Sequence, residues 1–563
     1  MTISSIKWRA AAALACAVLL VAASDAQITW KPIENDPVRI DGGLVSGTYL
    51  ASGVKAYLGI PFAAPPIREN RWREPQPVKP WQGVWTANRC PAECAQSLRN
   101  NNNNHYFGDE DAAEDCLYLN MWLPASAKAG QKLPVMVWIY GGAFSGGSAS
   151  MAVYSGEHMA RKGVIYVAPN YRLGVFGFMA HPEATRESGH NASGNWGLLD
   201  QVAALKWIQR NIASFGGDPG NVTIMGQSAG SMSVNYLQAS PLAKGLFHKA
   251  VGMSGSALGG ALMSGGLRDG EAQGLKLQAA MKLNSLGEMR TFSSDKVMAA
   301  AQANQLRFGP VVDGYFLPAF PADIFRAGRQ SDIPILVGCT ANDMGTRVPI
   351  RNAATAAGYR EAAAKMYGSK AAEFLELYPA SSDAEAKAQA EVVAIESGLS
   401  AHPRKWAKAQ AETGKSPAYL YLFSRVHPYT PGVVFADHDP ATAGAYHMGD
   451  VPYWLMTLDS FNLFRSTRSW TPYDRDLSNK MSDVLVNFAR TGNPSTAAVK
   501  MVEYNPNDEQ LVDFGDSIRI IKLHTKGMDF LEATPVLEQP RPAPGRRGGA
   551  PGPERSPRGR TFR

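Results

Sequence analysis

The chain has 563 residues, of which 45% are hydrophobic and 19% charged, so it can form a large core and is not wholly disordered. Its net charge of +7 is concentrated at the two ends. Residues 540–563 contribute +6 and residues 1–26 contribute +1, which leaves residues 27–539 neutral. Because this neutral body has no basic patch interleaved with aromatic residues, we expect no nucleic-acid partner.

The first 26 residues have the pattern of a secretory signal peptide. Lys7 and Arg9 precede an apolar run over 10–23, and small residues at positions 24 and 26 define a cleavage site before Gln27. We therefore expect an exported protein, either periplasmic or secreted. No later segment has 18 consecutive apolar residues, so we expect no transmembrane segment.

Cleavage there would leave four cysteines, at positions 90, 94, 116 and 339. Disulfides form in the oxidising compartments that exported proteins enter. Four cysteines allow three complete pairings, and their spacing does not choose among them.

Between residues 27 and 539, short apolar runs alternate with helical patterns. Runs that are apolar throughout are typical of a parallel sheet with helices on both faces. We predict strands at Val135–Ile139, Val164–Val167, Val222–Met225, Ile333–Val337 and Ala418–Phe423, and helices at 198–212, 360–377 and 383–396, the last two on the surface. No change of composition interrupts this part, which predicts a single α/β domain over 27–539 with a large, mostly parallel central sheet.

The C-terminal segment 540–563 contains seven Arg, six Pro and five Gly but one aromatic residue, Phe562. Such a composition buries too little apolar surface to fold alone, so we expect a disordered basic tail. The alternative is that its arginines contact an anionic surface, such as membrane lipid or a polyanionic glycan.

A candidate nucleophile follows the strand predicted at Val222–Met225. Residues 226–230 have the pattern G-x-S-x-G, with Ser228 at its centre and a helical pattern after it. Small flanking residues allow a sharp strand-to-helix turn, and that turn projects the serine hydroxyl above the edge of the sheet. The alternative is a glycine-rich loop with an inert serine.

A serine nucleophile also needs a base, an acid that orients the base, and donors for the developing oxyanion. Tyr140–Phe144 directly follows the strand predicted at Val135–Ile139 and contains two glycines. Glycine lets the backbone approach a substrate closely, so Gly142 and Ala143, together with Ala229 after the nucleophile, are the candidate oxyanion hole.

These features resemble the type B carboxylesterase/lipase family, the cholinesterase-like branch of the α/β hydrolases, and its para-nitrobenzyl-esterase-like bacterial members in particular. The similarity extends over about residues 38–525. The matching segments are 59–66, 114–120, 170–174, 194–201, 215–219, 226–230 and 487–494.

The resemblance implies an α/β-hydrolase fold, a Cys94–Cys116 disulfide and a catalytic histidine at position 447, within Gly444–His447. Cys90 and Cys339 then stay unassigned, either as thiols or as a second disulfide. Alignment from the preceding strand places Asp343 where the family has a catalytic glutamate. A rival alignment places Met344 there, which has no charge.

Two further positions are compared with the family. Gln227 replaces the usual glutamate before the nucleophile, which removes a negative charge and argues against a choline esterase. Ser254 resembles a second, buried serine that supports the catalytic histidine.

The function implied is hydrolysis of a small-molecule carboxylic ester through an acyl-enzyme, with Ser228, His447 and Asp343 as the triad. We expect no organic cofactor and no metal, because no spacing of metal ligands is present. The alternatives are a non-catalytic binding protein on the same fold, and lactonase, amidase or polyester-depolymerase chemistry by the same triad.

Overall fold

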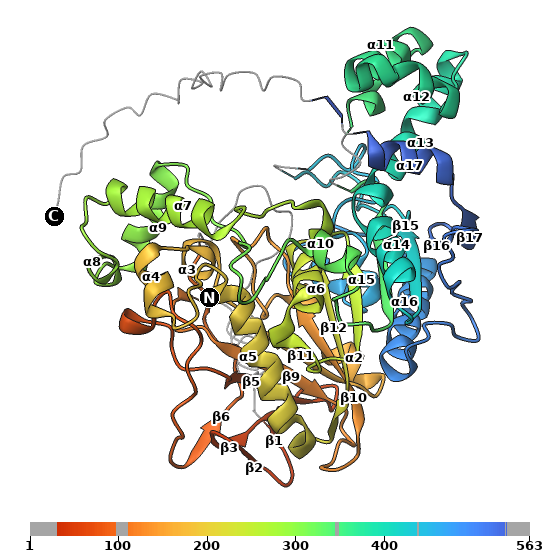
Figure 1. Cartoon of the computed structure of the whole chain (residues 1–563). Helices are drawn as coiled ribbons and strands as arrows, with labels where there is room; N and C mark the ends of the chain where they lie inside the picture. Colours follow the sequence, from red (N-terminus) through yellow and green to blue (C-terminus); the bar gives the residue numbers. More distant parts are fainter. Residues whose placement is uncertain (1–30, 97–110, 344–347, 436–437, 535, 538–563) are drawn as a thin grey trace, which may run out of the picture. The chain divides into compact units, whose positions relative to one another are not determined.

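The computed structural model describes residues 31–96, 111–343, 348–435, 438–534 and 536–537 (Figure 1). The predicted signal peptide, the predicted tail over 540–563 and Met344 lie outside these residues. The described chain forms two compact units, one within 1–347 and 395–525 and the other within 348–394 and 526–563. The single domain expected over 27–539 stays a prediction, and each unit is described by itself.

The first unit contains a twelve-stranded sheet in the order β1-β4-β5-β9-β11-β10-β12-β13-β14-β15-β16-β17. Strands β11 to β16 in this order are parallel to one another, and the flanking pairs are antiparallel. The mostly parallel α/β sheet is therefore confirmed. Its strands are β1 (Lys31–Pro32), β4 (Thr48–Tyr49), β5 (Lys55–Pro61), β9 (Tyr118–Leu123), β10 (Leu133–Ile139), β11 (Ile165–Pro169), β12 (Gly217–Gln227), β13 (Lys249–Met253), β14 (Ile335–Thr340), β15 (Ala418–Phe423), β16 (Gln510–Phe514) and β17 (Ile518–Lys522).

Two small sheets accompany it. One pairs β2 (Val38–Ile40), β3 (Gly43–Ser46) and β6 (Val84–Thr86), and the other pairs β7 (Glu93–Cys94) with β8 (Ala112–Ala113).

Helices cover the sheet, and α6 and α16 both pack against β10 and β12. Figure 1 shows α5 and α6 beside these strands. The helix predicted over 198–212 is present as α5, which begins two residues earlier. The helices of this unit are α2 (Glu157–Arg161), α3 (Gly174–Phe178), α4 (Pro182–Glu187), α5 (Trp196–Asn211), α6 (Ala229–Ala239), α7 (Leu267–Ala280), α8 (Leu286–Arg290), α9 (Ser294–Ala303), α10 (Pro321–Arg326), α14 (Pro403–Thr413), α15 (Val451–Trp454) and α16 (Pro472–Thr491).

The register of the parallel strands aligns their carboxyl ends. Ile139 at the end of β10 is in register with Gly226 in β12, and Gln227 is in register with Met253 at the end of β13. Met253 is in turn in register with Gly338 in β14. Because the carboxyl ends of parallel strands share one edge, the segments that follow these four strands emerge together there. Those segments contain the predicted oxyanion turn, Ser228, Ser254 and Asp343.

The second unit is helical and contains α11 (Ala356–Tyr367), α12 (Ala371–Leu377), the first part of α13 (Asp383–Ala401) and most of α17 (Thr525–Ala533). The sequence predicts continuous helix over 360–377, but the structure breaks it at Gly368, which has a φ of 56°. These helices are also less exposed than expected, because the rings of Tyr359, Phe374 and Phe530 form a small aromatic core.

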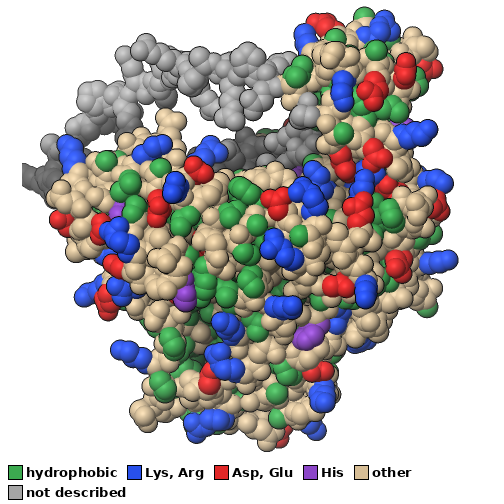
Figure 2. Space-filling model, in the orientation of Figure 1, with side chains coloured by type: hydrophobic (Ala, Val, Ile, Leu, Met, Phe, Trp, Pro, Cys, Tyr) green, Lys and Arg blue, Asp and Glu red, His purple; other side chains and the backbone are tan. Residues whose placement is uncertain are grey.

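Charge on the surface is mixed in sign. Figure 2 shows Lys and Arg interspersed with Asp and Glu over the face in view, which agrees with the neutrality of residues 27–539. Among the described residues, no helix is both long enough and apolar enough to cross a membrane.

Candidate active site

Ser228 occupies a sharp turn between β12 and α6. Its backbone has a φ of 58° and a ψ of −123°, a combination that costs a non-glycine residue conformational energy. Glycine is required on both sides: a Cβ at Gly226 would lie 2.5 Å from the carbonyl carbon of Gly230, and one at Gly230 would lie 2.0 Å from the oxygen of Ile139. The G-x-S-x-G spacing is thus what allows β12 and α6 to meet at this angle.

Hydrogen bonds on both sides hold the strained turn. The amide of Ser228 donates to the carbonyl of Met253 on β13 over 2.8 Å, and the carbonyl of Ser228 accepts from the amide of Met232 over 3.0 Å. Ser228 thereby begins α6, and the amide of Ala229 lies in the first turn of that helix. The positive end of the helix dipole is consequently next to the serine hydroxyl.

The turn after β10 lies directly against this serine. A Cβ at Gly141 would lie 2.9 Å from the Cβ of Ser228, so the backbone there approaches as closely as glycine allows. Gly142, Ala143 and Phe144 all have positive φ angles, of 116°, 54° and 58°. The sequence-predicted oxyanion turn therefore lies next to the candidate nucleophile, in a conformation that L-residues rarely adopt.

His447 and Asp343 form a close pair at the same edge of the sheet. Nδ1 of His447 lies 2.6 Å from Oδ1 of Asp343. The Asp343 side chain is 1% exposed and that of His447 is 22% exposed. The backbone amide of Asn342 donates to the carbonyl of Ala445, and the side-chain oxygen of Asn342 accepts from the amide of Ala445. The loop with Asp343 is thus fixed to the loop with His447.

The Asp343 carboxylate is ionised, and this defines the proton positions on His447. Burial alone would raise the pKa of Asp343, but the charge and hydrogen bond of His447 outweigh it, with help from Ser254 and His402, and lower the pKa to about 2. A carboxylate can only accept, so Nδ1 of His447 carries the proton it donates. Nε2 of the neutral imidazole then carries the acceptor lone pair of the ring and is the basic atom.

That basic atom faces Gln227. The side-chain nitrogen of Gln227 lies 3.1 Å from Nε2 of His447, and Gln227 is 2% exposed. The structure therefore brings together Asp343 with His447, Gln227 with His447, and Ser228 with the oxyanion turn.

Two titratable groups close to the Asp343–His447 pair were not predicted. Asp450, three residues after His447, is fully buried, and one of its oxygens accepts a hydrogen bond from the hydroxyl of Tyr421 over 2.8 Å. Burial, opposed by that hydrogen bond and reinforced by the charge of Asp343, raises the pKa of Asp450 to about 6. Burial lowers the pKa of His402, whose charge interacts with Asp343 and His447. Asp450 had one sequence signal, its short distance from His447, whereas His402 had none.

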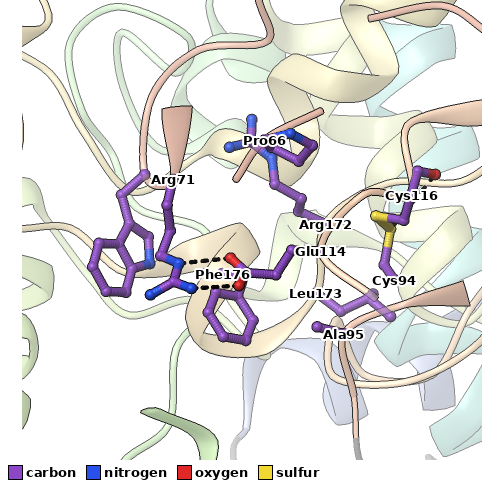
Figure 3. Close-up of a pocket in the computed structure, with 10 residues that line it drawn as sticks. Pro66, Arg71, Cys94, Ala95, Glu114, Cys116, Arg172, Leu173 and Phe176 are labelled. Carbon is purple, nitrogen blue, oxygen red and sulfur yellow. Dashed lines mark hydrogen bonds and ion pairs between the residues drawn. A yellow bond between two sulfur atoms is a disulfide. The ribbon is translucent and has the colours of Figure 1, made fainter. Parts of the chain in front are cut away.

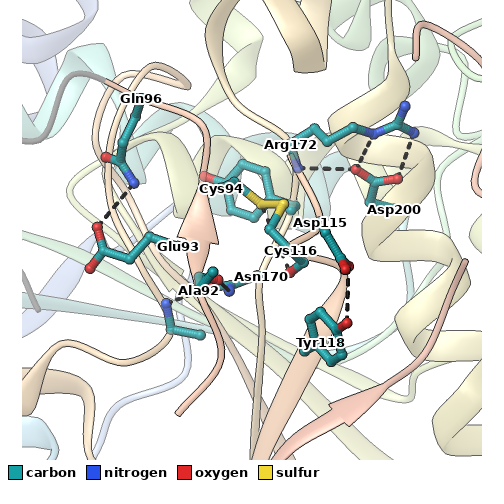
Figure 4. Close-up of a disulfide and its surroundings, with 12 residues drawn as sticks. Ala92, Glu93, Cys94, Gln96, Asp115, Cys116, Tyr118, Asn170, Arg172 and Asp200 are labelled. Atoms are coloured by element: carbon teal, nitrogen blue, oxygen red, sulfur yellow. Dashed lines mark hydrogen bonds and ion pairs between the residues drawn. A yellow bond between two sulfur atoms is a disulfide. The ribbon is translucent and has the colours of Figure 1, made fainter. Parts of the chain in front are cut away.

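The disulfide between Cys94 and Cys116 is present (Figure 4). Gln96, two residues after Cys94, bonds the backbone of Gly147 in both directions, each over 2.8 Å. The disulfide segment is thereby attached to the chain that follows the oxyanion turn. Cys90 and Cys339 form no disulfide within the described residues.

A small pocket lies beside the disulfide (Figure 3). Its lining includes both cysteines and the Arg71–Glu114 ion pair, in which Nε of Arg71 lies 2.6 Å from the Glu114 carboxylate. Neither Ser228 nor His447 lines it, so it is separate from the site above. Among the described residues, no group of three or more His, Cys, Asp or Glu side chains could hold a metal ion.

The chain matches known proteins over most of its length. A model of the carboxylesterase family matches residues 34–531. The chain is 36% identical to fumonisin B1 esterase of Sphingopyxis macrogoltabida over 469 residues, which cover 80% of this chain and 81% of that protein. It is 33% identical to para-nitrobenzyl esterase of Bacillus subtilis (strain 168) over 495 residues, covering 85% and 94%. A solved structure of a PNB esterase superposes with a TM-score of 0.72 at 30% identity, covering 89% of this chain and 99% of the other.

Proposed function

We propose that Ser228, His447 and Asp343 are the catalytic triad of this chain, which belongs to the carboxylesterase family. The chain is a carboxylic ester hydrolase with an α/β-hydrolase fold. The observation that carries the proposal is the 2.6 Å contact between Nδ1 of His447 and the buried carboxylate of Asp343. It orients an imidazole whose other nitrogen is basic, at the same sheet edge as the strained serine turn.

The first half of the reaction forms an acyl-enzyme. The Ser228 oxygen attacks the ester carbonyl while Nε2 of His447 takes the hydroxyl proton, which requires the imidazole to contact Ser228. The Asp343 carboxylate stabilises the imidazolium that results. His447 then gives this proton to the departing alcohol as the carbon–oxygen bond breaks, which leaves the acyl group on Ser228.

The second half repeats these steps with water. Nε2 of His447 takes a proton from water, the hydroxide attacks the acyl carbon, and the returned proton releases Ser228 and a carboxylic acid. In both halves the negative oxygen is held by the backbone amides of Gly142, Ala143 and Ala229. Donors aimed at such an oxygen each contribute about 10²- to 10³-fold in rate.

We propose a small-molecule ester without a cationic group as the substrate. Gln227 places a neutral amide 3.1 Å from the base, at a position where a carboxylate would attract a cation. The neutral charge of residues 27–539 likewise provides no general attraction for a charged partner. We therefore expect neutral aryl and alkyl esters to be turned over faster than choline esters of the same acyl group.

We also propose that the enzyme works outside the cytoplasm, in the periplasm or the medium. The Cys94–Cys116 disulfide supports this, because such bonds persist in oxidising compartments.

Substitution of the nucleophile tests the mechanism. We expect Ser228→Ala to lose at least about 10³-fold in kcat on a chromogenic aryl ester, because water alone must then attack. The matched control is Ser293→Ala, which alters an exposed serine without a side-chain capping bond and should retain parental kcat. A folded Ser228→Ala enzyme with near-parental turnover would show that another group is the nucleophile.

A further inference from the structure

Gln227 connects the candidate oxyanion turn to the candidate base. It is the last residue of β12, and its backbone is fixed by pairing with Met253 on β13. Its side-chain nitrogen lies 3.1 Å from Nε2 of His447. On the other side its amide oxygen lies against Gly141, where a Cβ would be 3.1 Å from that oxygen. With 2% exposure, the amide is enclosed between these two segments.

The direction of the Gln227–His447 hydrogen bond follows from the other ring nitrogen. Because Nδ1 donates its proton to the ionised Asp343, Nε2 of neutral His447 can only accept. The Gln227 amide is therefore the donor. Since Nε2 is also the atom that must take the serine proton, the amide occupies the reactive lone pair when no ester is bound.

A hydrogen-bond donor at this position favours the neutral imidazole. Protonated Nε2 would carry a hydrogen that points at the N–H of the amide, and two donors that face each other repel. A carboxylate in the same place would do the opposite and favour the imidazolium. The side chain at position 227 thus influences the charge state of the base by direct contact.

We propose that Gln227 is a positioning residue for the esterase reaction: its amide caps Nε2 of His447 in the resting enzyme, keeps the ring neutral and oriented, and yields its place to the Ser228 hydroxyl during catalysis. This inference rests on the proposed triad.

Other ionisable groups also act on the Asp343–His447 pair. Asp450 directly precedes α15 and His402 directly precedes α14. The charges of both residues interact with Asp343 and with His447. None of them changes when position 227 is substituted. The difference between the pH profiles of the parent and its variants therefore isolates the contact with Gln227.

The test is the pH dependence of kcat/KM for a neutral aryl ester, in the parent and in Gln227→Glu and Gln227→Met. A carboxylate beside Nε2 should move the acid limb of Gln227→Glu to higher pH by about one to three units. Methionine has a similar shape and no donor, so Gln227→Met should lose about two- to tenfold in kcat with little change in KM. The matched control is Gln302→Glu, which adds the same charge at an exposed position on α9 and should leave the acid limb within about 0.3 units of the parent.

The proposal is overturned if the acid limb of folded Gln227→Glu stays within about 0.3 units of the parent. Should the buried glutamate prevent folding, Gln227→Met decides alone, and unchanged kcat in that variant equally overturns it. Failure of the proposed triad would give a different result: the Ser228→Ala variant would then keep the activity of the parent, whatever the effect of substitutions at position 227.

Discussion

Asp343 is the member of the proposed triad whose role the structure allows to be quantified. Burial raises its pKa, but its neighbours, chiefly His447, outweigh burial and lower the pKa from 3.8 to about 2, which is a net stabilisation of the carboxylate by nearly two pKa units. At about 1.4 kcal/mol per unit this amounts to about 2 kcal/mol. Asp343→Asn removes that charge, and the loss of imidazolium stabilisation alone should lower kcat roughly 30-fold. The asparagine amide can also donate to Nδ1, which holds the imidazole in the wrong tautomer and increases the effect, up to about 10⁴-fold.

The assay is steady-state hydrolysis of a neutral chromogenic ester at pH 8, with KM measured separately from kcat. We expect the loss in kcat, because the carboxylate stabilises charge that develops in the reaction and does not contact the substrate. Asp323→Asn, an exposed aspartate paired with Arg326 on α10, is the matched control. Parental kcat in folded Asp343→Asn, together with a large loss in Asp450→Asn, would refute the reasoning and identify Asp450 as the acid.

Two predictions concern stability. Burial raises the pKa of Asp450 from 3.8 to about 6, so its ionisation costs free energy that grows as the pH rises from 4 to 6. Asp450→Asn can still accept a hydrogen bond from Tyr421. This variant should therefore raise the free energy of unfolding, measured by urea denaturation, by about 3 kcal/mol at pH 8 and hardly at all at pH 4. An equal effect at pH 8 and pH 4 would contradict the raised pKa of Asp450. The paired substitution Cys94→Ser with Cys116→Ser opens a loop with a sequence separation of 22 and should cost about 3 kcal/mol, so a thermal midpoint equal to that of the oxidised parent would count against it.

Local sequence patterns were sufficient for the part of the site that lies on neighbouring strands. The glycines at 226 and 230 predict the serine turn because a Cβ there would collide with the turn itself and with the neighbouring strand β10. The continuous apolar runs predict parallel strands, and their shared edge brings Ser228 next to the turn at Gly141. The pairing of Cys94 with Cys116, which spacing left open, was given by the family resemblance and is present.

The rest depends on contacts between distant segments. Among ten histidines, no local pattern distinguishes His447, and its pairing with Asp343 joins residues 104 positions apart. The contact between Gln227 and His447 spans 220 positions. The pKa of Asp450 is raised by burial, and a single aspartate before an apolar segment does not predict that burial. The Ala-rich pattern of residues 360–377 predicts a surface helix and gives no indication of the core formed by Tyr359, Phe374 and Phe530.

The central claim is that the strained serine at the start of α6 is the nucleophile, and covalent trapping tests it most directly. The parent enzyme is inactivated with one equivalent of an organophosphate, and the modified residue is located by peptide mass spectrometry. The account predicts a single phosphoryl group on Ser228, formed in proportion to the loss of activity. Complete inactivation with the phosphoryl group on a different residue, or full activity with Ser228 modified, would contradict it.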